Sequence, residues 1–171
     1  MGFFPKLAIG LVILSGVAYI SFSGFIRYEH SKELQKAEKK YIGKMAPKDE
    51  VLQSYLGKKV VLIFWMINSK ASNKEIDVVS SLYEEMKKKG LHDIVTVVLD
   101  ENLNKRDLDE FIKKNGIKYR VLFDENNQGI NNPFVKKFDI LNIPSIWVID
   151  ENGKVIAQNL KSIFYVEEFL K

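Results

Sequence analysis

The stretch FDILNIPSIWVIDENGKVIAQNL, residues 138–160, predicts a β-hairpin. Two runs rich in apolar and β-branched residues, SIWVID and KVIAQNL, flank the turn sequence ENG. The dipeptide Ile143-Pro144 stands directly before the first run. The hairpin is therefore expected to begin just after a proline and to end near residue 160.

Upstream of the hairpin, short apolar runs alternate with amphipathic ones, a pattern typical of strands connected by helices. KVVLIFW is apolar on both faces and predicts a central strand. Asn132 followed by Pro133 predicts one helix start, and Ser162 predicts another. The further predicted strands are 59–65, 93–99 and 119–123, and the predicted helices are 74–90, 106–116, 131–140 and 162–171. This order predicts a three-layer α/β/α domain.

The N-terminus has a different composition. Residues 7–26 carry no charge, and at about 1.5 Å per residue they span roughly 30 Å, the hydrocarbon thickness of a bilayer. They predict a transmembrane anchor in the lipid bilayer within residues 1–27, a charged helical stalk at 28–43 and a domain at 44–171. The alternative is a cleaved signal peptide with small residues, Ser21 and Ser23, before the cut. The Lys and Arg residues of the stalk favour a cytoplasmic domain.

The composition argues against several kinds of site. The net charge is +4 with lysines spread along the chain, so no nucleic-acid partner is expected. The chain contains no cysteine, which excludes disulfides, thiolate chemistry and cysteine-bound metals. Its two histidines, His30 and His92, are far apart in sequence. DENNQG, residues 124–129, begins like a calcium loop, but Val135 occupies the twelfth position, where a bidentate Glu is needed. We expect no metal and no cofactor.

Four stretches resemble the membrane-anchored thioredoxins of the TlpA/ResA type: IGKMAP, GKKVVLIFW, Lys74-Glu75 and the hairpin segment 138–160. The resemblance extends over residues 41–160 and implies a thioredoxin-like fold. Pro144 stands where this family has its cis-proline, at the border of the active-site groove. The resemblance also implies an extracytoplasmic (periplasmic) domain, opposite to the orientation that the basic residues favour.

The Cys-x-x-Cys motif of that family falls on Ser69-Lys70-Ala71-Ser72. A serine hydroxyl forms no dithiol–disulfide couple, so disulfide exchange is excluded for this chain. Either the cysteines were lost naturally, or a Cys-to-Ser pair was introduced into an active enzyme. Asn68 and Ala71 also depart from the family pattern, and these neighbouring departures favour natural loss.

The two serines are interpreted as vestigial, with no catalytic residue. Ser72 and Glu75 have the spacing of a capping box, in which each side chain satisfies a free N–H at the start of a helix. A nucleophilic serine would need a base within hydrogen-bond reach, and neither histidine lies in a stretch expected near this loop. A groove can remain without its cysteines, and Asn68, Lys70, Ile143 and Pro144 are predicted to border it.

These features predict a redox-inactive, membrane-anchored thioredoxin-like protein that acts as a binding or structural subunit of a membrane protein complex. The alternative is a TlpA/ResA-like thiol-disulfide oxidoreductase, active in disulfide reduction or cytochrome c maturation and represented by its Cys-to-Ser variant. A peroxiredoxin-like peroxidase is excluded by the same lack of cysteine.

Overall fold

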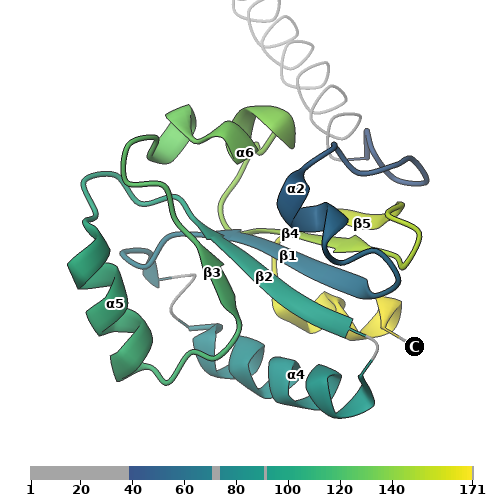
Figure 1. The fold of residues 1–171 in the computed structure, drawn as a ribbon, viewed down its shortest axis with the longest axis horizontal. Coiled ribbons are helices and arrows are strands. Elements are labelled where there is room, and N and C mark those ends of the chain that lie inside the picture. The colour runs from purple at the N-terminus through teal and green to yellow at the C-terminus, as the bar shows by residue number, and fades with distance from the viewer. Residues whose placement is uncertain (1–38, 71–73, 91, 171) are drawn as a thin grey trace, which may run out of the picture. The chain divides into compact units, whose positions relative to one another are not determined.

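Residues 39–70, 74–90 and 92–170 are described by the computed structural model, and they belong to a unit spanning Lys39–Lys171 (Figure 1). The predicted anchor at 7–26 and the stalk residues 28–38 lie outside the described residues. Within the described part, no helix combines the length and the apolar character needed to cross a bilayer. The anchor therefore stays a prediction from the sequence.

A mixed five-stranded sheet forms the centre of the domain, in the order β3-β2-β1-β4-β5. The strands are β1 (Lys59–Trp65), β2 (His92–Val98), β3 (Arg120–Leu122), β4 (Ser145–Ile149) and β5 (Val155–Leu160). β1 pairs in parallel with β2 and antiparallel with β4, which confirms that the KVVLIFW run is central. β4 and β5 form the predicted hairpin.

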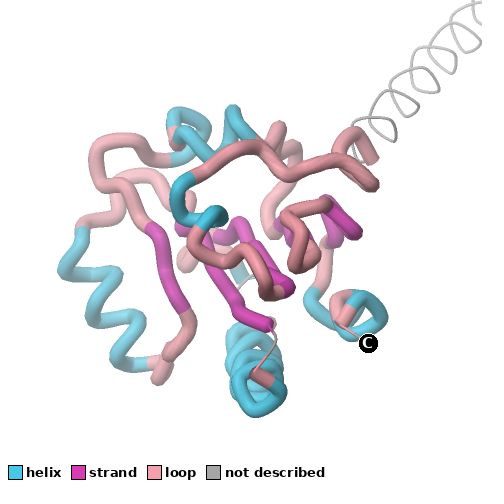
Figure 2. The backbone as a smooth tube through the Cα atoms, turned by 45° about the vertical axis from the view of Figure 1, so that its right-hand side comes forward, coloured by secondary structure: helices cyan, strands magenta, loops and turns pink. Residues whose placement is uncertain are grey.

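Helices cover both faces of the sheet and give the predicted three layers (Figures 1 and 2). The helical elements are α2 (Glu50–Gln53), α4 (Ile76–Lys89), α5 (Lys105–Lys114), η1 (Gly129–Asn131), α6 (Pro133–Lys137), η2 (Ile163–Tyr165) and η3 (Glu167–Phe169). Because successive side chains of a strand point to opposite faces, β1 contributes to two cores. Val61, Ile63 and Trp65 pack with α4, α5 and η2, whereas its alternate residues pack with α2 and α6.

Two predicted helix starts are confirmed. The side chain of Asn132 accepts a hydrogen bond from the backbone N–H of Phe134 at 3.0 Å, and Pro133 is the first residue of α6. The hydroxyl of Ser162 accepts one from the N–H of Phe164 at 3.4 Å. The C-terminal segment is nevertheless not the predicted helix, because it forms the two short 3-10 turns η2 and η3.

Two further differences concern helix starts. α4 begins at Ile76, two residues later than the periodicity predicts. α2 was not predicted, because its four residues are too short to show helical periodicity. Its start is fixed by Asp49, whose carboxylate accepts a hydrogen bond from the N–H of Val51 at 3.0 Å. This is the N-cap interaction that an Asp before a helix commonly makes.

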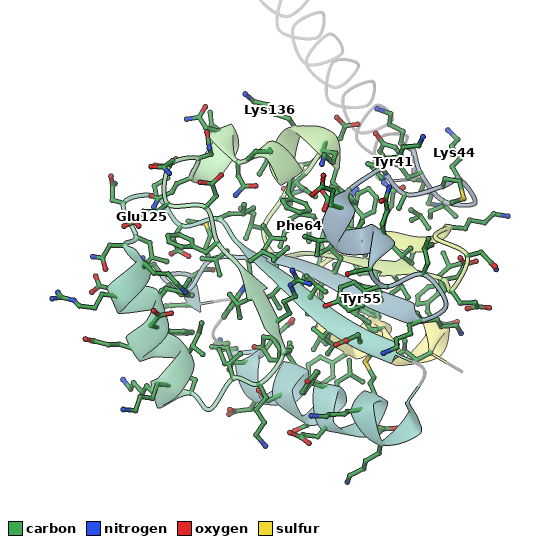
Figure 3. All side chains as sticks on the ribbon, in the orientation of Figure 1. Tyr41, Lys44, Tyr55, Phe64, Glu125 and Lys136 are labelled. Carbon is green, nitrogen blue, oxygen red and sulfur yellow. The ribbon has the colours of Figure 1, made fainter. Side chains whose placement is uncertain are left out.

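The segment before α2 packs against the hairpin. The ring of Tyr41, labelled in Figure 3, lies 5.5 Å from that of Trp147, and its N–H donates to Gln158 Oε1 at 2.5 Å. The N–H of Gly43 donates to the carbonyl of Val155, whose own N–H donates to Lys44, both at 2.8 Å. The last residues of the predicted stalk thus contribute ordered contacts to the domain.

We expect the fragment 39–171 to fold cooperatively without the anchor, because residues of this unit supply both cores. In that fragment, Tyr41→Ala should lower the free energy of unfolding by about 2 kcal/mol, since it removes an aromatic pair and partly buried ring area. Urea denaturation followed by circular dichroism measures this. Tyr165→Ala is the matched control, because Tyr165 is 62% exposed, and it should change stability by no more than about 0.5 kcal/mol. Equal effects of the two changes would contradict the packing role of Tyr41.

Candidate functional site

The loop that follows β1 is held by a buried carboxylate. Asp100 is 1% exposed, and its two oxygens accept hydrogen bonds from the backbone N–H groups of Ile67 at 2.6 Å and Asn68 at 2.9 Å. β1 and β2 run parallel, so their carboxyl ends meet at one edge of the sheet, where Leu99 N–H also donates to Trp65 O at 2.9 Å. A buried charge is tolerated when it is hydrogen-bonded in this way. Asp100 therefore fixes the backbone just ahead of Ser69.

Sequence reasoning missed Asp100. The available signal was a carboxylate directly after the buried strand that ends VTVVL. Its partners lie more than 30 residues earlier in the chain, so only the pairing of β1 with β2 reveals them.

Pro144 lies beside the start of α4. The Ile143-Pro144 peptide bond is cis, as the resemblance implies. Pro144 lines a small cavity together with Trp65, Glu75, Ile76 and other residues of the sheet and α4. The hairpin entrance and the end of β1 thus meet next to the degenerate motif.

The predicted groove residues differ in their exposure. Asn68, Lys70 and Ile143 are exposed, whereas Pro144 is half-buried. Neither Asn68 nor Lys70 lines the cavity at Pro144. Pro144 therefore lies against α4, whereas Asn68 and Lys70 lie on the loop surface. No described contact joins Asn68 or Lys70 to Pro144.

The motif serines are described only in part. Ser69 is half-buried, and its backbone N–H donates to Met66 O at 3.2 Å. Ser72 lies outside the described residues, and with it the predicted capping box. Glu75, the other member of that box, accepts a hydrogen bond from the N–H of Ile163 at 3.2 Å. Its carboxylate thus links the start of α4 to η2.

The cavity wall carries aromatic groups with little acid–base capacity. Tyr119 is buried against Tyr83, with ring centroids 6.0 Å apart, and burial raises the pKa of its hydroxyl from near 10 to about 12. Trp65 Nε1 is buried and has no hydrogen-bond partner among the described residues.

The two histidines are not placed near the loop that follows β1. His92 is the first residue of β2, at the end of the sheet opposite the loop, and His30 lies outside the described residues. Neither histidine is therefore placed beside Ser69 by the described residues.

The calcium-like segment 124–129 forms a turn closed on itself. Asp124 Oδ1 accepts hydrogen bonds from the N–H groups of Asn126 and Asn127, and its Oδ2 accepts one from Asn127 Nδ2 at 2.9 Å. These bonds, that from the Asn127 side chain first, lower the pKa of the Asp124 carboxyl. Among the described residues, no three His, Asp or Glu side chains are grouped as a metal site requires.

Comparison with known proteins identifies the family. Residues 35–158 match the AhpC/TSA family. The chain belongs to this family. Among curated relatives, the thiol-disulfide oxidoreductase ResA of Bacillus cereus is 28% identical over 165 residues, covering 94% of this chain and 91% of ResA. ResA of Geobacillus kaustophilus is 24% identical and covers 88% of this chain and 82% of its own length.

Solved structures show the same fold. The thioredoxin domain of a thiol-disulfide oxidoreductase from Bacteroides vulgatus aligns with a TM-score of 0.61 at 22% identity, over 76% of this chain and 98% of that domain. A thiol:disulfide interchange protein DsbE from Chlorobium tepidum aligns with a TM-score of 0.62 at 22% identity, over 75% and 92%. The chain therefore has a thioredoxin-like fold, and it contains no cysteine with which to exchange disulfides.

Asp100→Asn should lower the free energy of unfolding by about 1–3 kcal/mol, because the amide offers one acceptor oxygen where the carboxylate offers two. Its NH₂ group would face a backbone N–H that cannot accept a hydrogen bond. Urea denaturation of the fragment 39–171 measures the change. Asp77→Asn is the matched control, since Asp77 is exposed and makes no side-chain bond within the described part of the chain, and its effect should stay within about 0.5 kcal/mol. Equal stability losses would show that Asp100 does not hold the loop.

Proposed function

We propose that the protein is a redox-inactive, membrane-anchored member of the AhpC/TSA family that acts as a binding or structural subunit of a membrane protein complex. The observation that carries this proposal is a complete thioredoxin-like domain in a chain without cysteine. Thiol–disulfide exchange requires a thiolate, so the fold has to serve this protein in another way.

The geometry at the end of β1 supports a binding role. Asp100 holds the backbone of Ile67 and Asn68, while the side chains of Lys70 and Ile143 are exposed. A surface with a fixed backbone and exposed side chains loses little conformational entropy when a partner binds. Lys70 offers a positive charge, which favours an acidic segment in the partner.

The proposed location is the membrane, with the domain on the extracytoplasmic side. Residues 7–26 supply the apolar length for a span. The basic residues of the stalk favour the opposite orientation, but long domains translocate in spite of flanking charge. Reaction of an introduced exposed cysteine, such as Lys136→Cys, with a membrane-impermeant thiol reagent on intact cells distinguishes the two orientations.

The second candidate is a thiol-disulfide oxidoreductase present as its Cys-to-Ser variant. The observation in its favour is the similarity to relatives named thiol-disulfide oxidoreductase. The codons at positions 69 and 72 of the source gene decide between the two candidates. Cysteine codons there would show that Ser69 and Ser72 were introduced.

The double change Ser69→Cys with Ser72→Cys should restore at most a small fraction of disulfide-reductase activity. The reason is that Asn68 and Ala71, which border the cysteine positions, also depart from the pattern of active thioredoxins. Insulin reduction is the assay, with ResA of Bacillus cereus as the positive control. Activity comparable to that of ResA would instead favour the Cys-to-Ser variant.

Lys70→Glu should reduce recovery of the partner when the protein is purified from native membranes, because it replaces the positive charge of the loop by a negative one. The melting temperature should be nearly unchanged, since Lys70 is exposed. Lys136→Glu is the control, an exposed lysine on α6 (Figure 3). Recovery of the partner at the wild-type level with Lys70→Glu would show that the partner binds at a surface other than the groove.

A further inference from the structure

A recess lies at the end of β1 that is opposite to the Ser69 loop. It has a volume of about 180 Å³ and is formed by α2, the residues around it and the turn between β4 and β5. Val60 contributes to its floor, whereas Trp65 lies next to the loop. At about 3.3 Å per residue, Val60 and Trp65 are separated by roughly 17 Å along the strand. The recess is therefore separate from the groove proposed above.

Apolar side chains line the recess and extend to its rim. Leu52, Val60 and Ile149 are among the lining residues, and two exposed ones are Met45 (61%) and Leu56 (60%). A Cβ atom added at Gly153 would lie 3.1 Å from Met45 Cε and 3.4 Å from Leu56 Cδ2. The ends of these two side chains thus converge over the glycine backbone. Exposed apolar residues that converge on a hollow are a feature of binding sites rather than of scattered surface residues.

Two acidic residues line the recess, and they differ in their partners. Asp49 pairs with Lys137 at 2.5 Å, whereas Asp150 Oδ1 accepts hydrogen bonds from the backbone N–H groups of Asn152 at 3.0 Å and Lys154 at 2.7 Å, which carry no charge.

Two basic residues also line the recess, Lys48 and Lys58. Both are exposed, and neither has an ion-pair partner among the residues that the structure describes. With Asp49 paired to Lys137, the two lysines exceed the remaining carboxylate, Asp150, by one positive charge, and the recess offers an apolar floor with a weakly positive rim.

We propose that this recess is a second docking site, which binds an acidic segment of a partner protein through one inserted aromatic or large aliphatic side chain. A cavity of about 150 Å³ with apolar walls accommodates benzene, so the volume suits a single such side chain. Protein interfaces commonly place one apolar anchor in a pocket and surround it with polar contacts. Lys48 and Lys58, which line the recess, would attract carboxylates next to that anchor.

The recess fits this occupant better than two others. The chain's own residues 27–38 contain three basic and three acidic side chains, so they do not complement a positive rim. An anionic membrane surface would complement the charge, but lipid contact requires apolar groups that project outward, whereas the apolar surface here is hollow.

The test uses the full chain in nanodiscs of neutral phosphatidylcholine and fluorescently labelled pentapeptides as probes. By fluorescence anisotropy, acetyl-Asp-Asp-Phe-Asp-Asp should bind, and this binding should weaken as the ionic strength rises. The peptides acetyl-Asp-Asp-Ala-Asp-Asp and acetyl-Lys-Lys-Phe-Lys-Lys should bind at least about tenfold more weakly. The first lacks the aromatic side chain that fills the recess, and the second lacks the carboxylates that attract the lysines. Absence of binding, or equal affinities for the three peptides, overturns the proposal.

Variants then locate the site. Leu56→Gln, and separately Lys48→Glu combined with Lys58→Glu, should each weaken binding of the acidic Phe peptide about tenfold. The matched controls are Ile130→Gln, at a side chain that is 74% exposed on η1, and Lys136→Glu on α6, and both should leave the affinity unchanged.

Lys70→Glu alters the groove at the other end of β1, so loss of peptide binding in this variant but not in Leu56→Gln would assign the peptide to the groove and overturn the proposal. Wild-type affinity in Leu56→Gln overturns the proposal. Leu56-dependent binding of phosphatidylglycerol vesicles without peptide binding does so as well, because the face would then contact lipid.

Discussion

Strand β1 is hydrogen-bonded along both of its edges, to β2 on one side and β4 on the other, and its residues from Val60 to Trp65 are buried on both faces. Every layer of the domain is built on this strand, because its alternate side chains belong to the two cores. Only the two ends of such a strand are near solvent. The loop held by Asp100 lies at one end and the apolar recess at the other, so both candidate surfaces occupy places where a rigid element meets the exterior.

The elements that could be predicted from sequence are those specified by neighbouring residues. The unbroken apolar run of β1, the ENG turn of the hairpin and the Asn132 cap of α6 are all local signals, and the structure contains each of them. Asp100 and Tyr41 could not be assigned in this way. Their partners lie in other elements. The residues next to Asp100 or Tyr41 in the sequence do not indicate which distant residue each one contacts.

In the C-terminal segment the capping residue could be predicted from sequence, but the type of helix could not. Ser162 caps a turn as its sequence indicates, but whether the turn continues as an α-helix depends on packing beyond it. Ile163 and Val166 are both buried, and their spacing of three matches a 3-10 repeat. For the candidate site, sequence could place Pro144 and the serine positions along the chain, whereas the position of Pro144 beside Trp65 and Ile76 required the three-dimensional arrangement.

The N-terminal segment that binds β5 has a consequence for the protein during its synthesis. An uncovered strand at the edge of a sheet can recruit another chain and start aggregation. Here the backbone of Gly43 and Lys44 occupies the outer edge of β5 at Val155, and the opposite edge strand, β3, has three residues and begins at the exposed Arg120. During synthesis the N-terminal side of a chain emerges first. The covering segment has therefore already left the ribosome when β5 appears, so this edge can be closed as soon as it is made.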